Sequence, residues 1–201
     1  MEQEMQSWKN TGLQLLKTKS EAHTDVVVGM MLFLVLVVAL LFGFRISQFM
    51  ITAAGVEDAL AASNLASAVI DLEEYGRSHT IQIPDTEMAF WTFREALCYN
   101  LRLDEYLNTT NTDFLAAPIE IKEYIVYNVK ENVVETQVRD GKGLLLRLET
   151  GVKGMVYTPD KICVETTTIY SRIGYWVEGL MGQVLYGEKE KSVDIVRCDS
   201  E

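Results

Sequence analysis

Side chains that could carry out chemistry are few and scattered in this chain of 201 residues. The two histidines, His23 and His79, are far apart, and neither has a second histidine at the spacing of a metal site. Glu57 and Asp58 form an acidic pair, but adjacent carboxylates on a helix point in different directions. Nucleophile elbows, phosphate-binding loops and nucleotide-binding fingerprints do not occur. The sequence therefore predicts a protein that is not an enzyme, with no metal, no cofactor and no small-molecule substrate.

The cysteines are Cys98, Cys163 and Cys198, and no two of them form a Cys-x-x-Cys pair for zinc or dithiol chemistry. Their odd number leaves at least one thiol unpaired. If this part of the chain lies outside the cell, we expect a disulfide between Cys163 and Cys198, because both fall in predicted strands of one sheet. Three free, buried thiols remain an equal alternative.

An uninterrupted apolar run from Val26 to Phe44 dominates the organisation of the chain. A helix of nineteen residues is about 28 Å long, close to the hydrocarbon thickness of a bilayer. Asp25 precedes the run and Arg45 follows it, so charges mark both of its ends. The pattern predicts a transmembrane helix over residues 25–45, with membrane lipid as its surroundings.

The distribution of basic residues favours a cytoplasmic N-terminus. Lys9, Lys17 and Lys19 precede the apolar run, whereas only Arg45 follows it closely. Residues 1–24 are then a cytoplasmic leader, and the remainder of this single-pass protein lies outside the cell membrane. A cleavable secretory signal is the alternative, but the run exceeds the roughly 7–15 residues of a signal core.

The charge of the chain is confined to the part beyond the apolar run. The first 45 residues carry four acidic and four basic side chains, so the formal charge of −11 belongs to the rest. Such acidity argues against nucleic acid as a partner, since nucleic-acid binding requires clustered Lys and Arg. A hydrophobic content of 48% excludes a disordered tail. Together with the orientation above, we expect residues 78–201 to form one extracytoplasmic α/β head.

A helix extension over residues 46–77 is predicted to join the membrane segment to the head. Apolar residues recur there at steps of three and four, which defines one helical face, and we expect one continuous helix from Asp25 to Tyr75. In water this face must be covered by the chain's own sheet or by a neighbouring protein. We expect this face to be the assembly interface and to include Phe49, Val56 and Leu60.

The head is predicted to contain a second helix and then a sheet. The helix is capped by Asp85 or Thr86, buries Phe90 and Phe93, and ends near Asn108. Residues 174–187, rich in glycine and apolar side chains, are expected to form a loop or short helix. The fold class is therefore α+β, with a C-terminal antiparallel β-sheet packed on the helices. The predicted strands are Ile119 to Val129, Val133 to Val138, Leu144 to Leu148, Lys161 to Ile173 and Val193 to Cys198.

This order of parts resembles that of a TadE-like pseudopilin of a tight-adherence pilus, a type IV pilin-like family. The resemblance rests on the basic stretch from Lys17 to Ser20, the acid Asp25 before the apolar run, and the helix continuation AAGVEDALAASNLASAVIDLEEYG. It implies cleavage between Ser20 and Glu21, which would make Asp25 the fifth mature residue. The family usually has Gly before the cut and Glu in place of Asp25.

Two roles for Asp25 follow from its position. An acid in the first turn of a helix caps free backbone N–H groups. Alternatively, its carboxylate pairs with the α-amino group of a neighbouring, processed subunit. The resemblance implies a structural or assembly subunit of a pilus or secretion apparatus, with other pilin-like subunits or pilus assembly proteins as partners.

A second hypothesis is a bitopic membrane protein with an extracytoplasmic sensor or ligand-binding head. The twenty or so residues before the membrane are too few for a cytoplasmic output domain, so such a sensor needs a membrane partner. Aromatic residues at these spacings are more often part of a core. The aromatic residues expected to line its pocket are Trp91, Tyr99, Tyr170, Tyr175 and Trp176.

Overall fold

The structure is a computed structural model that describes residues 2–110, 115–179 and 182–196. The chain divides into two compact units, Met1–Gln48 and Phe49–Glu201. The first unit is part of helix α1 (Glu2–Ser67). The second unit, here called the head, contains the last turns of α1 and all other elements.

Helix α1 ends at Ser67, so the predicted continuous helix to Tyr75 is wrong. The Asp71 N–H donates to the Gln82 carbonyl instead of continuing the helix. The Asp71 side chain then accepts from the N–H groups of Glu73 and Glu74, which caps a separate helix, α2 (Leu72–Ser78). The spacing of apolar residues alone predicts that the helix continues, but the capping Asp71 starts a new helix instead.

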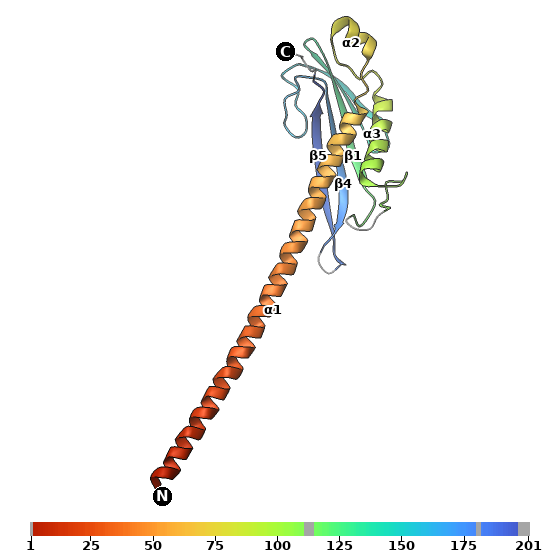
Figure 1. The fold of residues 1–201 in the computed structure, drawn as a ribbon. Helices are drawn as coiled ribbons and strands as arrows, with labels where there is room; N and C mark the ends of the chain where they lie inside the picture. The colour runs from red at the N-terminus through yellow and green to blue at the C-terminus, as the bar shows by residue number, and fades with distance from the viewer. Residues whose placement is uncertain (1, 111–114, 180–181, 197–201) are drawn as a thin grey trace. The chain divides into compact units, whose positions relative to one another are not determined.

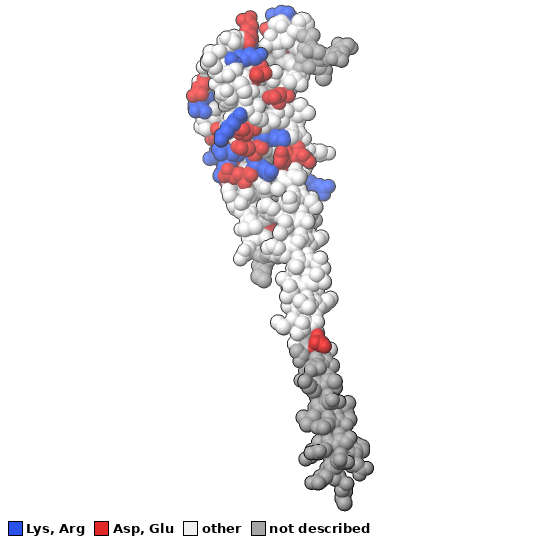
Figure 2. All heavy atoms as spheres, turned by 90° about the vertical axis from the view of Figure 1, so that its left-hand side faces the viewer, with Lys and Arg blue, Asp and Glu red and all other residues white. Residues whose placement is uncertain are grey.

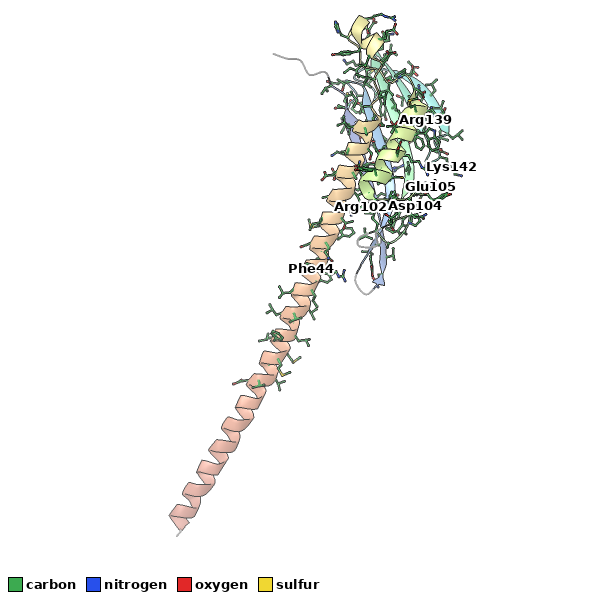
Figure 3. All side chains as sticks on the ribbon, turned by 45° about the vertical axis from the view of Figure 1, so that its right-hand side comes forward. Phe44, Arg102, Asp104, Glu105, Arg139 and Lys142 are labelled. Atoms are coloured by element: carbon green, nitrogen blue, oxygen red, sulfur yellow. The ribbon has the colours of Figure 1, made fainter. Side chains whose placement is uncertain are left out.

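Helix α3 (Thr86–Leu101) begins at the predicted cap, Asp85, whose carboxylate accepts from two backbone N–H groups. It ends at Leu101, earlier than the predicted end near Asn108. Arg102 adopts a left-handed conformation there, and its N–H donates to the Tyr99 carbonyl, which ends the helix. Asp104 follows in the next turn (Figure 3), and its Oδ1 accepts from the N–H groups of Tyr106 and Asn108, each at 2.8 Å.

The five strands form one antiparallel sheet in the order β3-β2-β1-β4-β5. With helices packed on this sheet, the fold is α+β, as predicted. The turn at residues 140–143 joins β2 to β3. The strands are β1 (Glu120–Lys130), β2 (Val133–Arg139), β3 (Leu145–Val152), β4 (Thr168–Glu178) and β5 (Val184–Asp194).

The last two strands differ from the prediction, because residues 174–187 belong largely to the β4–β5 hairpin. Gly174 and Gly187 lie within these strands, and each makes room for a tyrosine from the neighbouring strand. A Cβ on Gly174 would lie 2.5 Å from Tyr186 Oη, and one on Gly187 would lie 3.1 Å from Tyr175 Cζ. These glycines allow close cross-strand packing, and they were misread as loop signals.

Both faces of the central strands β1 and β4 are covered, whereas the edge strand β3 is exposed (Figure 1). On one face, the end of α1 and α3 pack against the sheet, with Leu60, Phe93 and Tyr124 fully buried. On the other face, Val164 and Val156 from the long β3–β4 connection cover a smaller core. The last three turns of α1 are thus part of the head's main core. The smaller core comprises Ile125, Tyr127, Val129, Val134, Val138, Val164 and Tyr170.

Candidate functional site: helix α1

The apolar segment of α1, Val26–Phe44, is exposed on all sides in its own unit. Its large apolar side chains are 36–69% exposed. Among the described residues, α1 is the helix long and apolar enough to cross a membrane. An exposed apolar surface of this size is unfavourable in water and requires a cover. The segment is therefore compatible with a single-pass membrane anchor.

Asp25 is exposed and lies inside α1, because the helix begins at Glu2. The capping role considered for Asp25 thus does not apply to the uncut chain. Ser20 and Glu21, the expected processing site, also fall within α1. Cleavage between them would expose a new helix start within one or two turns of Asp25.

Two of the three expected interface residues are covered by the chain's own head. Val56 is 2% exposed and Leu60 is 0% exposed, and both belong to the main core. They are therefore not available to a neighbouring subunit while the head is folded. Phe49, at 41% exposed, remains accessible.

Buried polar side chains on the same face attach α1 to the sheet. Asn64 Nδ2 donates to the Lys191 carbonyl at 2.9 Å, and Ser171 Oγ donates to Asn64 Oδ1 at 2.7 Å. Ser67 Oγ lies 2.9 Å from Tyr124 Oη, and either oxygen can donate. Buried polar groups with partners of this kind fix one arrangement of a helix on a sheet.

This polar contact was not predicted from the sequence. Asn64 and Ser67 stand four and seven positions after Leu60, so they lie on the helical face that contains Leu60. That spacing was the available signal, but small polar residues in an alanine-rich stretch look like a solvated surface. The helical face is therefore a contact with the chain's own sheet, apolar at Leu60 and polar beyond it.

An ion cluster adds a further link between α1 and β5. Glu57 accepts from Lys191 Nζ at 2.9 Å and from Lys189 Nζ at 3.1 Å. Hydrogen bonds from these ammonium groups, Lys191 first, hold the pKa of Glu57 below its ordinary value. The same contact raises the pKa of Lys191. The three side chains are about one third exposed, so this cluster is a modest, salt-sensitive contribution.

The five aromatic residues expected to line a pocket are not brought together. Tyr99 is 85% exposed on α3, whereas Tyr175 is buried in the helix-side core. Tyr170 is buried on the opposite face of the sheet, where its hydroxyl donates to Glu190. A shallow depression over β4 and β5 is lined by Arg172, Glu188, Lys189 and Glu190, and by none of the five. This arrangement does not form the expected ligand pocket.

The remaining reactive side chains do not form a site in the described part of the chain. Within it, no three His, Cys, Asp or Glu side chains lie close enough to share a metal ion. Cys98 and Cys163 are free and half-buried, and burial raises the pKa of the Cys98 thiol. Cys198, the expected partner of Cys163, lies outside the described residues.

Comparisons with known proteins add no relative. No protein-family model matches the chain, and searches of curated proteins and of solved structures returned no match.

Proposed function

We propose that the chain is a membrane-anchored structural subunit, pilin-like in plan, that assembles with partners through helix α1. The observation that carries this proposal is the division of α1 into two surfaces. The segment Val26–Phe44 exposes apolar side chains on all sides, whereas Val56–Ser67 is packed into the head. A helix with these two surfaces suits a protein that is held in lipid at one end and presents a folded head at the other.

In this proposal the leader is cytoplasmic and the head lies outside the cell membrane. The lysines before the apolar segment favour this orientation, since positive charge is retained on the cytoplasmic side. Lateral contacts between subunits would use the exposed part of α1, including Asp25 and Phe49, because Val56 and Leu60 are buried in the head.

The first experiment is intact-mass analysis and N-terminal sequencing of the protein purified from its own membranes. A mature start at Glu21 would support prepilin-type processing and a role of Asp25 in assembly. An intact Met1 would contradict processing and leave an uncut single-span subunit.

The second experiment tests assembly directly by cysteine crosslinking in membranes. The variant Phe49→Cys should form crosslinked oligomers, whereas Leu60→Cys should not, because Leu60 is buried in the head. In the Phe49→Cys background, Asp25→Asn should reduce crosslinking but leave membrane insertion intact. Equal crosslinking at both positions, or none at Phe49, would count against lateral assembly through α1.

A sensor head is the weaker alternative. It was expected to bind a ligand among five aromatic residues, and these residues lie on different faces of the head. We therefore do not propose a ligand for it.

A further inference from the structure

The two halves of strand β5 differ sharply in chemistry. Val184, Leu185 and Tyr186 begin the strand and are 51%, 48% and 47% exposed. From Glu188 to Lys191 the side chains alternate between acidic and basic residues. Because successive side chains of a strand point to opposite faces, the start of β5 is apolar on both faces. We call residues 183–186 the hairpin tip.

The hairpin tip extends beyond the rest of the sheet. The last regular pair between β1 and β4 joins Glu120 to Gly174, and a single bridge joins Leu115 to Val177, whereas the β4–β5 pairing continues to Glu178 and Val184. The sequence between Glu178 and Glu188 contains no charged residue. An uncharged, two-faced apolar end of a hairpin is an unusual surface for a head that faces only water.

The tip lies at the end of the sheet where α1 enters the head. Lys191 contacts both Asn64 and Glu57, and Lys189 contacts Glu57, so α1 runs beside β5. Val184 is five residues before Lys189, about 16 Å along a strand. Phe49 is eight residues before Glu57, about 12 Å along a helix. Figure 1 shows the β4–β5 hairpin turning at this end of the head.

The sequence connects this end of the head closely to the apolar segment. Phe49, the first residue of the head, follows Phe44 by five positions, which is about 7.5 Å of helix. If Val26–Phe44 crosses a bilayer, only a few residues of chain separate that bilayer from the head, a connection short enough to let the tip reach the membrane surface.

The side chains around the tip suit the interface between lipid and water. Trp176 and Tyr186 pack together with ring centroids 5.0 Å apart, and Lys122 Nζ lies 5.8 Å from the centroid of the Tyr186 ring. Tryptophan, tyrosine and lysine are the residues that concentrate at membrane interfaces. The first charges beyond the tip already have partners, since Glu188 lies near Arg172 and Glu57 binds Lys189. Figure 2 shows charged side chains gathered over the middle of the head.

We propose that the hairpin tip docks on the lipid–water interface of the membrane that the apolar segment crosses. This inference rests on the membrane anchoring in the proposed function. The contact is apolar and aromatic, so it is insensitive to salt and does not require anionic lipid. It holds the head against the bilayer surface at a second point besides α1.

The test uses the full chain in phosphatidylcholine vesicles, with Cys98, Cys163 and Cys198 replaced by serine. An environment-sensitive fluorophore is attached at Val184→Cys, and the matched control carries it at Asn132→Cys in the β1–β2 turn. β5 spans eleven residues, so these ends of the sheet are about 33 Å apart. Brominated lipid should quench the probe at 184 at least threefold more than the probe at 132, equally at low and high salt.

A third probe at Leu34→Cys separates the two proposals. Quenching at 34 but not at 184 leaves the anchor in place and overturns docking of the tip. No quenching at 34 overturns the anchor, and the inference with it. A probe at 184 that is shielded from water but not quenched by brominated lipid indicates a protein neighbour and also overturns the inference.

A second variant tests the same contact without relying on one labelled position. Leu185→Asp should reduce quenching at 184 to the level of the 132 control. The matched substitution Leu146→Asp, on the exposed edge strand β3, should leave quenching unchanged. Unaltered quenching in Leu185→Asp would contradict docking through the tip, and circular dichroism of both variants verifies that the fold is retained.

Discussion

Asn64 of α1 and Ser171 of β4 are joined by a buried hydrogen bond of 2.7 Å, in which Ser171 Oγ donates to Asn64 Oδ1. The amide nitrogen of the same Asn64 donates to the Lys191 carbonyl on β5. One side chain therefore links α1 to two neighbouring strands. Because both ends of the amide are used, replacing Asn64 by an apolar residue leaves two buried polar groups without this partner.

Asn64→Leu should lower the free energy of unfolding of the head by about 1–3 kcal/mol, because the Lys191 carbonyl and the Ser171 hydroxyl lose their partner. Adding Ser171→Ala should recover part of this loss, since it removes one of the two orphaned groups. Denaturant unfolding of the full chain in detergent, followed by tryptophan fluorescence, measures both effects. Strictly additive losses in the double variant would show that the two side chains are not coupled.

Leu60→Ala should destabilise the head by about 2–5 kcal/mol, because a fully buried leucine leaves a cavity in the main core. Met50→Ala, on the same helix at 66% exposure, is the matched control and should change stability by less than about 0.5 kcal/mol. The same denaturant experiment measures both. Similar losses in the two variants would argue that α1 does not pack on the sheet at Leu60.

The Glu57 cluster predicts a specific dependence of stability on pH. Lys191 and Lys189 hold the pKa of Glu57 below its ordinary value of 4.5. The stabilisation is therefore present above pH 4.5 and is lost as the pH falls through the lowered pKa. At high pH the argument applies to Lys191, whose pKa is raised above its ordinary value of 10.5. Its contribution to stability is therefore fully present below pH 10.5 and is lost as the pH rises through the raised pKa.

Glu57→Gln should therefore reduce stability at pH 7 by up to about 1 kcal/mol, as for other partly exposed ion pairs. The difference from the native chain should shrink below pH 4 and in 1 M salt. Glu165→Gln, on the exposed β3–β4 connection, is the control and should show neither trend. Thermal melts across pH provide the comparison, and a difference that does not shrink as the pH falls below 4.5 would contradict the ion-pair interpretation.

Alanine substitutions at two glycines distinguish the cost of backbone strain from the cost of crowding by neighbouring side chains. Gly143 has φ +82° and a Cβ there would lie 2.8 Å from the Phe90 ring, whereas Gly154 has φ +81° with open space around it. Gly154→Ala should cost about 1 kcal/mol from its left-handed backbone alone. Gly143→Ala should cost at least about 1 kcal/mol more, because a buried ring must also move. Equal losses of stability in thermal melts would show that the Phe90 ring moves aside without a measurable cost.

The overall class of fold was predictable because it depends on local patterns. The apolar run predicts the first part of α1, the capping Asp85 predicts α3, and β-branched residues predict the β1–β2 hairpin. Each of these signals lies within one element of the sequence. The head's α+β class followed from their order along the chain.

The errors share a physical cause, which is contact between distant parts of the chain. Gly174 and Gly187 are strand residues because tyrosines of the partner strand occupy the space above them. Leu60 is buried in a core that it shares with α3, β1 and β4, all distant in the sequence, so the sequence could predict an apolar face but not what covers it. Asn64 is part of the core only because Ser171 and Lys191 lie opposite.

The packing of α1 also determines when the head can finish folding during synthesis. Asn64 is separated from Ser171 by 107 positions and Lys191 contacts Glu57 over 134 positions. The helix leaves the ribosome first, yet the strands that bind Asn64 are made last. The growing chain must therefore leave Asn64 without these partners until β4 and β5 emerge, and contacts over such distances form slowly. A chain that stops before β4 would keep its apolar segment but lack much of the core of the head.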